Sequence, residues 1–180
     1  MSRRSGAHLA ARRTALAGLM IAVIEVCKLT LAAMPNIELT SFLLILFSVC
    51  FGRVTLFVVP AFILIEGMVY GFGLWWVMYL YAWPLLALCA RALPRSDSAF
   101  PYAMLSGVFG LLFGLLCSFP YFFIGLPQGI SYGLRQMITW WIAGIPFDLV
   151  HGVSNFLIML ALYRPMMQLL RRLRALFPDV

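Results

Sequence analysis

The chain carries too little charge for an ordinary soluble protein. Only 11% of its 180 residues are charged, and 64% are hydrophobic. A soluble domain has about 25% charged residues, which it needs to cover its surface. The composition therefore predicts an integral membrane protein that uses lipid as its solvent, built as a single all-α domain over residues 1–180.

The sequence also lacks signatures of catalysis and metal binding. It contains no HExxH zinc motif and no Walker loop of the form GxxxxGK[ST]. Its four cysteines lie one per apolar stretch without a CxxC pair, so we expect neither disulfides nor a metal site. Without a nucleotide loop, the chain cannot hydrolyse ATP by a familiar route. We therefore expect no enzyme and no cofactor of its own.

Positive charge gathers in alternate segments between the apolar stretches. Loops that stay in the cytoplasm keep Lys and Arg, because moving cations across a bilayer is costly. Six transmembrane helices with both termini in the cytoplasm explain the pattern, and only Lys28 and Arg135 fall on the outer side. The net charge of +7 then reflects topology and contact with anionic lipid, not nucleic-acid binding. The inner basic residues are Arg3, Arg4, Arg12, Arg13, Arg53, Arg91, Arg95, Arg164, Arg171, Arg172 and Arg174.

Apolar stretches and their breaks predict where the helices lie. A basic N-terminus (1–13) precedes a six-helix bundle (14–163), whose first helix is expected to be uncleaved, and a basic amphipathic tail (164–180) follows. The second helix is shorter than the roughly 20 residues that cross a bilayer, so it is tilted, partly buried in protein or incomplete. The Gly/Pro-rich residues 119–136 are predicted to form an outer loop. The expected spans are 14–33, 38–52, 54–70, 74–90, 102–119 and 137–162.

Two sets of small residues have the spacing of helix contacts. Such faces let helices in lipid approach backbone to backbone. On the first helix, the set serves either a partner protein or packing inside the bundle. The set on the fifth span is Gly107, Gly110 and Gly114, and the set on the first helix is Ala11, Ala15, Gly18 and Ala22.

Ionisable residues at membrane depth are costly and are functional by default unless they are paired for structure. Glu25 and Lys28 lie three apart on one helix face and can neutralise each other, so structural pairing is favoured over a role in a pocket. Glu66 has no cation near it on its own helix. Arg135 can balance Glu38 or Glu66, or hold an anionic group of a ligand.

Three polar residues line one face of the last span. Asp148, His151 and Asn155 lie at i, i+3 and i+7, so this face must look into the bundle or a cavity. It serves a hydrogen-bonded contact between helices or contact with a ligand. A third alternative, an intramembrane enzyme using Asp148 and His151, is weaker.

Aromatic residues begin two of the spans on the outer side. They form either a belt at the level of the lipid headgroups or a stacking surface for a flat ligand. Combined with the polar residues above, they give a candidate set for substrate binding. This set is Asn36, Glu38, Glu66, Trp75, Trp76, Tyr79, Arg135, Trp140, Asp148, His151 and Asn155.

Three stretches resemble those of a known family. They are Ala11–Ala15, Pro35–Thr40 with the helix that follows to Gly52, and Gly144–His151 with Asn155-Phe156 and Tyr163-Arg164-Pro165. Together they resemble an S component of an energy-coupling factor (ECF) transporter, the small membrane subunit that captures a vitamin or similar micronutrient. The first stretch is similar to the alanine motif by which S components contact the transmembrane T component.

The resemblance implies a ligand pocket near the outer face of a bacterial cell membrane. It also implies a T component and two ATPase subunits as partners, with ATP used by those subunits. No ligand-reading motif matches, so riboflavin, cobalamin, another vitamin and a queuosine-type precursor all remain open as substrates. The alternative function is a small multi-span scaffold in a cell-wall or shape-determining complex, which needs no pocket.

Overall fold

The computed structural model describes the backbone of residues 3–177 and the side chains of residues 8–177. Within that range the chain is helical and contains no strand. Its elements are α1 (Arg3–Leu31), α2 (Thr40–Phe51), the 3₁₀ turn η1 (Gly52–Val54), α3 (Thr55–Tyr70), α4 (Leu74–Ala92), α5 (Phe100–Leu111), α6 (Phe113–Gly125), the 3₁₀ turn η2 (Leu126–Gln128) and α7 (Ile130–Ala175).

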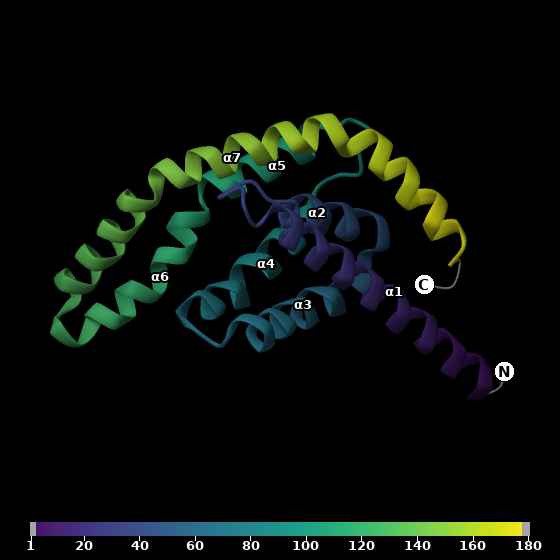
Figure 1. Cartoon of the computed structure of the whole chain (residues 1–180), viewed down its shortest axis with the longest axis horizontal. Coiled ribbons are helices and arrows are strands. Elements are labelled where there is room, and N and C mark those ends of the chain that lie inside the picture. Colours follow the sequence, from purple (N-terminus) through teal and green to yellow (C-terminus); the bar gives the residue numbers. More distant parts are fainter. Residues whose placement is uncertain (1–2, 178–180) are drawn as a thin grey trace.

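Five helical stretches are long and apolar enough to cross a membrane, as the composition predicts for a multi-pass protein. They are 8–31, 40–70, 74–92, 100–128 and 130–175, so the second and third predicted spans are counted as one. Gly52, at a φ of 54° that favours glycine, separates α2 from α3, and the chain changes direction there (Figure 1).

The short helix α2 lies inside the bundle. Eleven of its twelve residues are buried, and it contacts α1, α3, α4, α5 and α7. A 12-residue helix is about 18 Å long, well short of the hydrocarbon core. The sequence predicted that this short segment is tilted, partly buried in protein or incomplete, and the structure shows that it is buried in protein.

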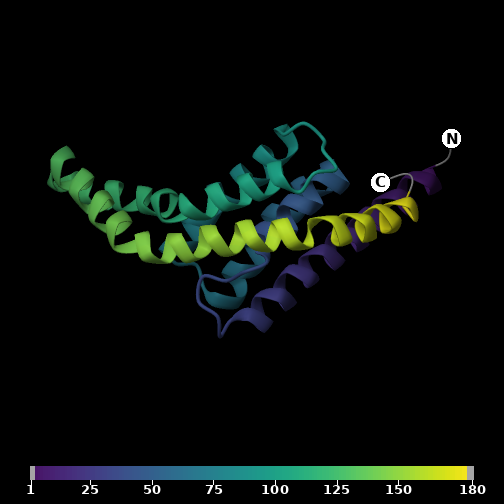
Figure 2. The same ribbon diagram turned by 90° about the horizontal axis from the view of Figure 1, so that it is seen from above.

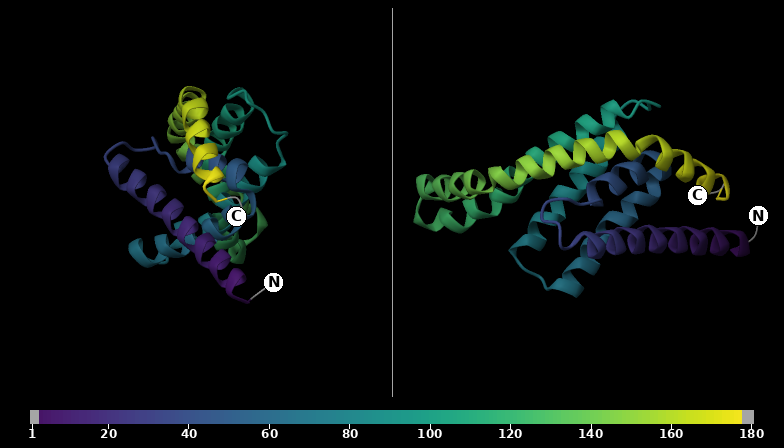
Figure 3. Two further views of the ribbon diagram at one scale, coloured as in Figure 1. Left: turned by 90° about the vertical axis from the view of Figure 1, so that its right-hand side faces the viewer. Right: turned by 45° about the horizontal axis from the view of Figure 1, so that its top comes forward.

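The two described ends of the chain lie at the same end of the molecule (Figures 1 and 2). At the opposite end, α6 and the first part of α7 form a hairpin that projects away from α1–α4 (Figure 3). Basic residues from separate segments meet at the end that holds the termini. Arg13, Arg53, Arg91, Arg95 and Arg174 line one cavity there, so the basic clusters share one side as the charge pattern predicts.

The glycines predicted to allow close helix packing do so between α5 and α7. A Cβ atom on Gly110 would lie 2.7 Å from the Gly152 Cα, and one on Gly152 would lie 3.0 Å from the Gly107 carbonyl oxygen. Real Cβ atoms do not approach backbone this closely, so side chains here would separate the helices. The small-residue prediction for this span is confirmed.

Residues 119–136 are helical on both sides of a short turn, so the prediction of an outer loop is wrong. Helix α6 runs through Pro120 to Gly125, and α7 starts at Ile130. The reversal needs only η2 and Gly129, whose φ is 115°. A Cβ on Gly125 would lie 2.8 Å from the Gly133 Cα, so these glycines serve close packing of the hairpin and do not interrupt its helices.

The last helix is far longer than the predicted span. Helix α7 has 46 residues and contains Pro146 and Pro165, and it arches over the other helices (Figure 1). Proline removes a helix hydrogen bond and bends a helix without necessarily ending it. Residues 164–175 of the predicted tail therefore continue this helix and are not a separate element, whereas residues 178–180 lie outside the described range. Of its predicted apolar face, only Leu170 is buried.

Candidate functional site: a buried polar and aromatic cluster

The first charged group of the cluster joins α1 to α3. Lys28 on α1 forms an ion pair with Glu66 on α3, whose side chain is only 2% exposed. The Glu25 Oε1 atom, one turn before Lys28, has no hydrogen-bond partner. The favoured pairing of Lys28 with Glu25 is corrected: α1 packs against α3, and the ion pair forms with the better-buried Glu66, while Glu25 lies against Glu66 in the same group.

Three aromatic rings surround the Lys28 ammonium. Its nitrogen lies 5.5 Å from the ring centres of Phe62 and Tyr79 and 5.6 Å from that of Tyr70. Each ring presents negative π density to the cation. The ion pair is thus enclosed by side chains of α3 and α4, at the end of the bundle opposite the arginines.

The second charged group joins the α1–α2 loop to α7. His151 Nε2 lies 3.1 Å from Glu38 Oε1, and the Ser41 hydroxyl donates a 2.5 Å hydrogen bond to the same oxygen. The Ser41 backbone N–H also donates to this carboxylate, at 3.1 Å, so Glu38 caps the first turn of α2. Burial alone raises the pKa of Glu38, but the bonds from His151 and Ser41 outweigh it and lower the pKa to about 2.

A chain of aromatic contacts connects the two charged groups. Tyr79, which lies against Lys28, meets Trp83 at 5.3 Å between ring centres. Trp83 meets Phe113 at 5.5 Å, and Phe113 meets the His151 ring at 5.1 Å. The candidate residues Glu38, Glu66, Tyr79 and His151 therefore belong to one continuous cluster, which is mostly apolar with a few polar groups. That composition is typical of small-molecule sites.

Several buried polar atoms in and around the cluster lack a hydrogen-bond partner. Asn155, which is fully buried, has neither its Nδ2 nor its Oδ1 atom bonded within the described chain. Trp83 Nε1, Ser106 Oγ and Glu66 Oε1 are in the same condition. Leaving a buried polar group unpaired costs about 1–3 kcal/mol. These atoms are the ones that a ligand or ordered water would satisfy.

Asp148 serves a contact between helices. Its Oδ1 accepts a 2.8 Å hydrogen bond from the backbone N–H of Gly114, in the first turn of α6. This N–H has no partner within its own helix, because α5 ends at Leu111 and α6 begins at Phe113. Asp148, His151 and Asn155 are all buried, so the prediction that this face looks into the bundle is confirmed. Asp148 and His151 have different partners and do not bond to each other.

Other candidate residues lie apart from the cluster or have structural partners. Arg135 and Trp140 are exposed on the α6–α7 hairpin, and Trp140 stacks on Tyr121 at 3.9 Å. The expectation that Arg135 balances Glu38 or Glu66 is wrong, because His151 and Lys28 do so. The reason is that α7 begins early and carries Arg135 outward.

The remaining candidates lie at the border of the cluster. Trp76 Nε1 donates a 2.7 Å hydrogen bond to the Ile63 carbonyl oxygen, which ties α4 to α3. Trp75 packs edge-on against Tyr79, with 5.2 Å between ring centres. Asn36 adopts a φ of 62° in the α1–α2 loop, and its carbonyl oxygen accepts from the Ser154 hydroxyl at 3.2 Å.

Sequence reasoning missed several residues of the cluster, among them Phe62, Trp83, Ser106 and Phe113. Trp83 follows Tyr79 by one helical turn, so helical spacing alone was a usable signal for it. The other three are ordinary residues of apolar spans, and only the packing of α3, α5 and α6 reveals their place.

The small residues of α1 are exposed, and Gly18 also borders the arginine-lined cavity. Ala11, Ala15, Gly18 and Ala22 are all exposed, and a Cβ added to Gly18 would meet nothing within 4 Å. Packing inside the bundle was the alternative that spacing slightly favoured, and it does not occur. This face is left for lipid or a partner helix.

Residues 129–133 spell the GxSxG letters of a hydrolase nucleophile elbow. In such an elbow the serine follows a β-strand. Here a 3₁₀ turn precedes it, and Ser131 is exposed in the first turn of α7. The match is therefore one of letters only.

Two cavities of the described chain stand out, and none of the candidate substrate-binding residues lines either of them. The larger, of about 1100 Å³, is the arginine-lined cavity. The smaller, of about 490 Å³, lies between α4 and the hairpin and is lined by Tyr81, Phe119, Phe122, Phe123, Leu134 and Met137. The polar residues Glu66, His151 and Asn155 are buried.

Taken with the helix lengths, these features define a helical protein of the multi-pass membrane class. Comparison with family models, with curated protein sequences and with solved structures finds no match to the chain.

Proposed function

We propose that this protein is the substrate-capture subunit of an ECF-type importer in a bacterial plasma membrane. In this proposal the chain crosses the membrane six times, with both termini and the arginine-lined end in the cytoplasm. A vitamin or related micronutrient binds from outside in the buried cluster, and a T component with two ATPase subunits drives its release inside.

The observation that carries the proposal is the unpaired state of polar atoms beside a row of aromatic rings. Asn155 presents an amide donor and an amide acceptor, and Trp83 presents an indole N–H. A planar, partly aromatic ligand with polar edges can use both features by stacking and by hydrogen bonding. Because Glu66, His151 and Asn155 are buried, binding in this proposal involves a movement of the α1–α2 loop or the hairpin.

The exposed small-residue face of α1 supports the partner in this proposal. A smooth face lets a helix of the T component approach closely and slide as the subunit tips. Replacing both Ala11 and Ala15 by leucine should abolish uptake in cells but leave ligand binding by the isolated subunit unchanged. Replacing Val23, which is exposed on another face of α1, by leucine is the control and should preserve both. Normal uptake by the Ala11/Ala15 variant would contradict the partner assignment.

The proposal is tested by purifying the protein from cells grown in rich medium and identifying bound small molecules by mass spectrometry. One metabolite at about one per chain is expected. The scaffold alternative draws on a different observation, namely that Asp148 and Gly114 bond helix to helix. It predicts a well-folded protein that carries no metabolite under any growth condition.

A further inference from the structure

The arginine-lined cavity has a composition unlike that of the buried cluster. It lies among α1, η1, α4, the loop after α4 and the end of α7, and has a volume of about 1100 Å³. Five arginines line it, and none of its lining residues that the structure describes is acidic. Four of them, Arg53, Arg91, Arg95 and Arg174, come from separate segments and form no ion pair with a carboxylate of the described residues, so the cavity suits an anion.

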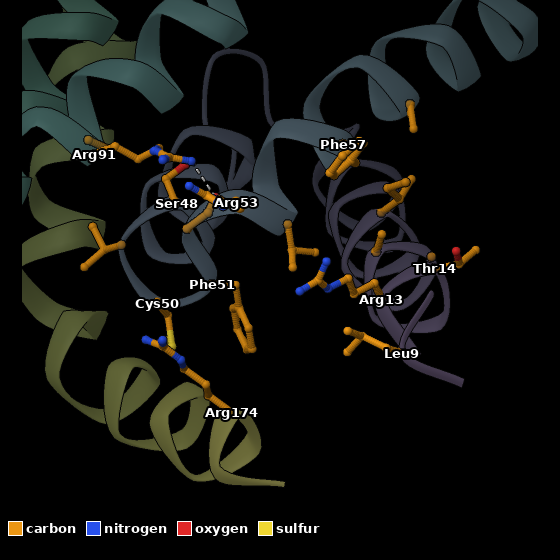
Figure 4. A pocket seen from close by; sticks show the side chains of 18 of the residues that line it. Leu9, Arg13, Thr14, Ser48, Cys50, Phe51, Arg53, Phe57, Arg91 and Arg174 are labelled. Atoms are coloured by element: carbon orange, nitrogen blue, oxygen red, sulfur yellow. Dashed lines mark hydrogen bonds between the residues drawn. The ribbon is translucent and has the colours of Figure 1, made fainter. Parts of the chain in front are cut away.

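The arginines surround the cavity from different sides. Figure 4 shows Arg53 and Arg91 beside Ser48, Arg174 reaching in from α7 next to Cys50, and Arg13 extending from α1 on the other side. Arg91 donates a 2.9 Å hydrogen bond to the Gly52 carbonyl oxygen, which holds η1 in place. Guanidinium groups bind phosphate oxygens through paired N–H donors, so this arrangement suits a phosphate group.

A buried polar group independently marks the cavity. Ser48 on α2 is 2% exposed, lines the cavity, and its hydroxyl has no hydrogen-bond partner within the described residues. An unpaired hydroxyl beside Arg53 and Arg91 can donate to an oxyanion (Figure 4). No contact within the described bundle accounts for it otherwise.

Most of the other side chains that line the cavity are apolar. Ile21, Phe51, Val54 and Phe57 line the same cavity, and Phe57 is 71% exposed. A free phosphate or a sugar phosphate has no use for such a surface, whereas an acyl chain does. Cationic and apolar walls in one cavity match an amphiphile with an anionic head.

We infer that this cavity is a binding site for an anionic phospholipid, with the phosphate of a phosphatidylglycerol-type head among the arginines and an acyl chain along Phe57. The lipid would fill the space between α1 and the end of α7 in the leaflet that contacts the arginines. This inference does not depend on the proposed substrate capture.

The test measures lipid binding to the purified full-length chain by native mass spectrometry. Phosphatidylglycerol is expected to bind at least tenfold more tightly than phosphatidylcholine. The double variant R53Q/R174Q should weaken phosphatidylglycerol binding by about 30-fold, since each arginine near a membrane surface contributes about a factor of five. The matched control R164Q/R172Q also removes two exposed charges from this part of the chain but none from the cavity lining, and should weaken binding by less than about threefold.

Each other outcome overturns the inference. Equal losses in the two double variants would mean general attraction to a basic surface. Displacement of the lipid by millimolar inorganic phosphate, with equal affinity, would assign the site to a free phosphate compound. Should R53Q/R174Q fail to fold, the single variant R95Q takes its place with an expected loss of about fivefold, and no loss would contradict the lipid site.

Discussion

Replacing Lys28 by methionine should destabilise the protein more than removing the charge of its partner. The variant K28M leaves Glu66 as a carboxylate that is only 1% exposed and has lost its cation. Removing one partner of a buried ion pair costs about 3–5 kcal/mol. The variant E66Q instead leaves Lys28, whose side chain is 21% exposed and lies near three aromatic rings. Water and the rings still stabilise that cation, so we expect a loss of about 1–2 kcal/mol.

The double variant K28M/E66Q should recover much of this loss, because the buried Glu66 charge and its cation are removed together. The coupling energy of the cycle is expected to be about 2 kcal/mol. The assay is reversible unfolding of the purified protein in mixed micelles, followed by circular dichroism. The variant E25Q is the control, since Glu25 is the partner that spacing along α1 favours. The argument fails if E25Q costs as much as E66Q, or if the two single losses simply add.

Two further predictions concern the helix seam and the Glu38 carboxylate. The variant G110A should lower the free energy of unfolding by about 1–3 kcal/mol, because its Cβ would lie 2.7 Å from the α7 backbone. A Cβ on the control G144A would meet nothing within 4 Å, so that variant should be neutral or stabilising by up to about 1 kcal/mol. The same unfolding assay measures both, and a neutral G110A would contradict the close seam. In the folded protein the pKa of Glu38 is about 2, below its ordinary value of 4.5. The Glu38 carboxylate therefore contributes about 3 kcal/mol to the free energy of unfolding above about pH 5, and this contribution is lost as the pH falls toward 2. Thermal unfolding of wild type and E38Q between pH 7 and pH 3 should show a steeper acid loss in the wild type, and parallel profiles would refute the assignment.

The sequence predicted those features that depend on composition and helical spacing. Lipid as solvent follows from the scarcity of charge, and the inward face of Asp148, His151 and Asn155 follows from their spacing on one helix. The spacing of Gly107, Gly110 and Gly114 likewise indicated that another helix approaches α5 closely, as α7 does at Gly152. Each of these properties is local to one helix, so no knowledge of the neighbouring helices was needed.

Features that depend on how helices meet were harder to predict. Spacing on α1 favoured Glu25 as the partner of Lys28, whereas packing against α3 supplies Glu66. The hairpin was missed because Gly and Pro usually break helices in water, while in lipid-exposed helices their backbone groups are satisfied by neighbours. Extending α7 to Ile130 carried Arg135 and Trp140 away from the cluster, so two predicted site residues are separated from it.

The measurement that most directly tests ligand capture compares the variants N155L and M159L. Both residues are fully buried on the same face of α7, one turn apart, but only Asn155 carries polar atoms without partners. If those atoms hold a ligand, N155L should reduce the amount of co-purifying metabolite at least tenfold. The ligand-free N155L protein should be at least as stable as the wild type. The variant M159L should retain the metabolite. Wild-type metabolite retention by N155L, or equal loss in both variants, would contradict the account.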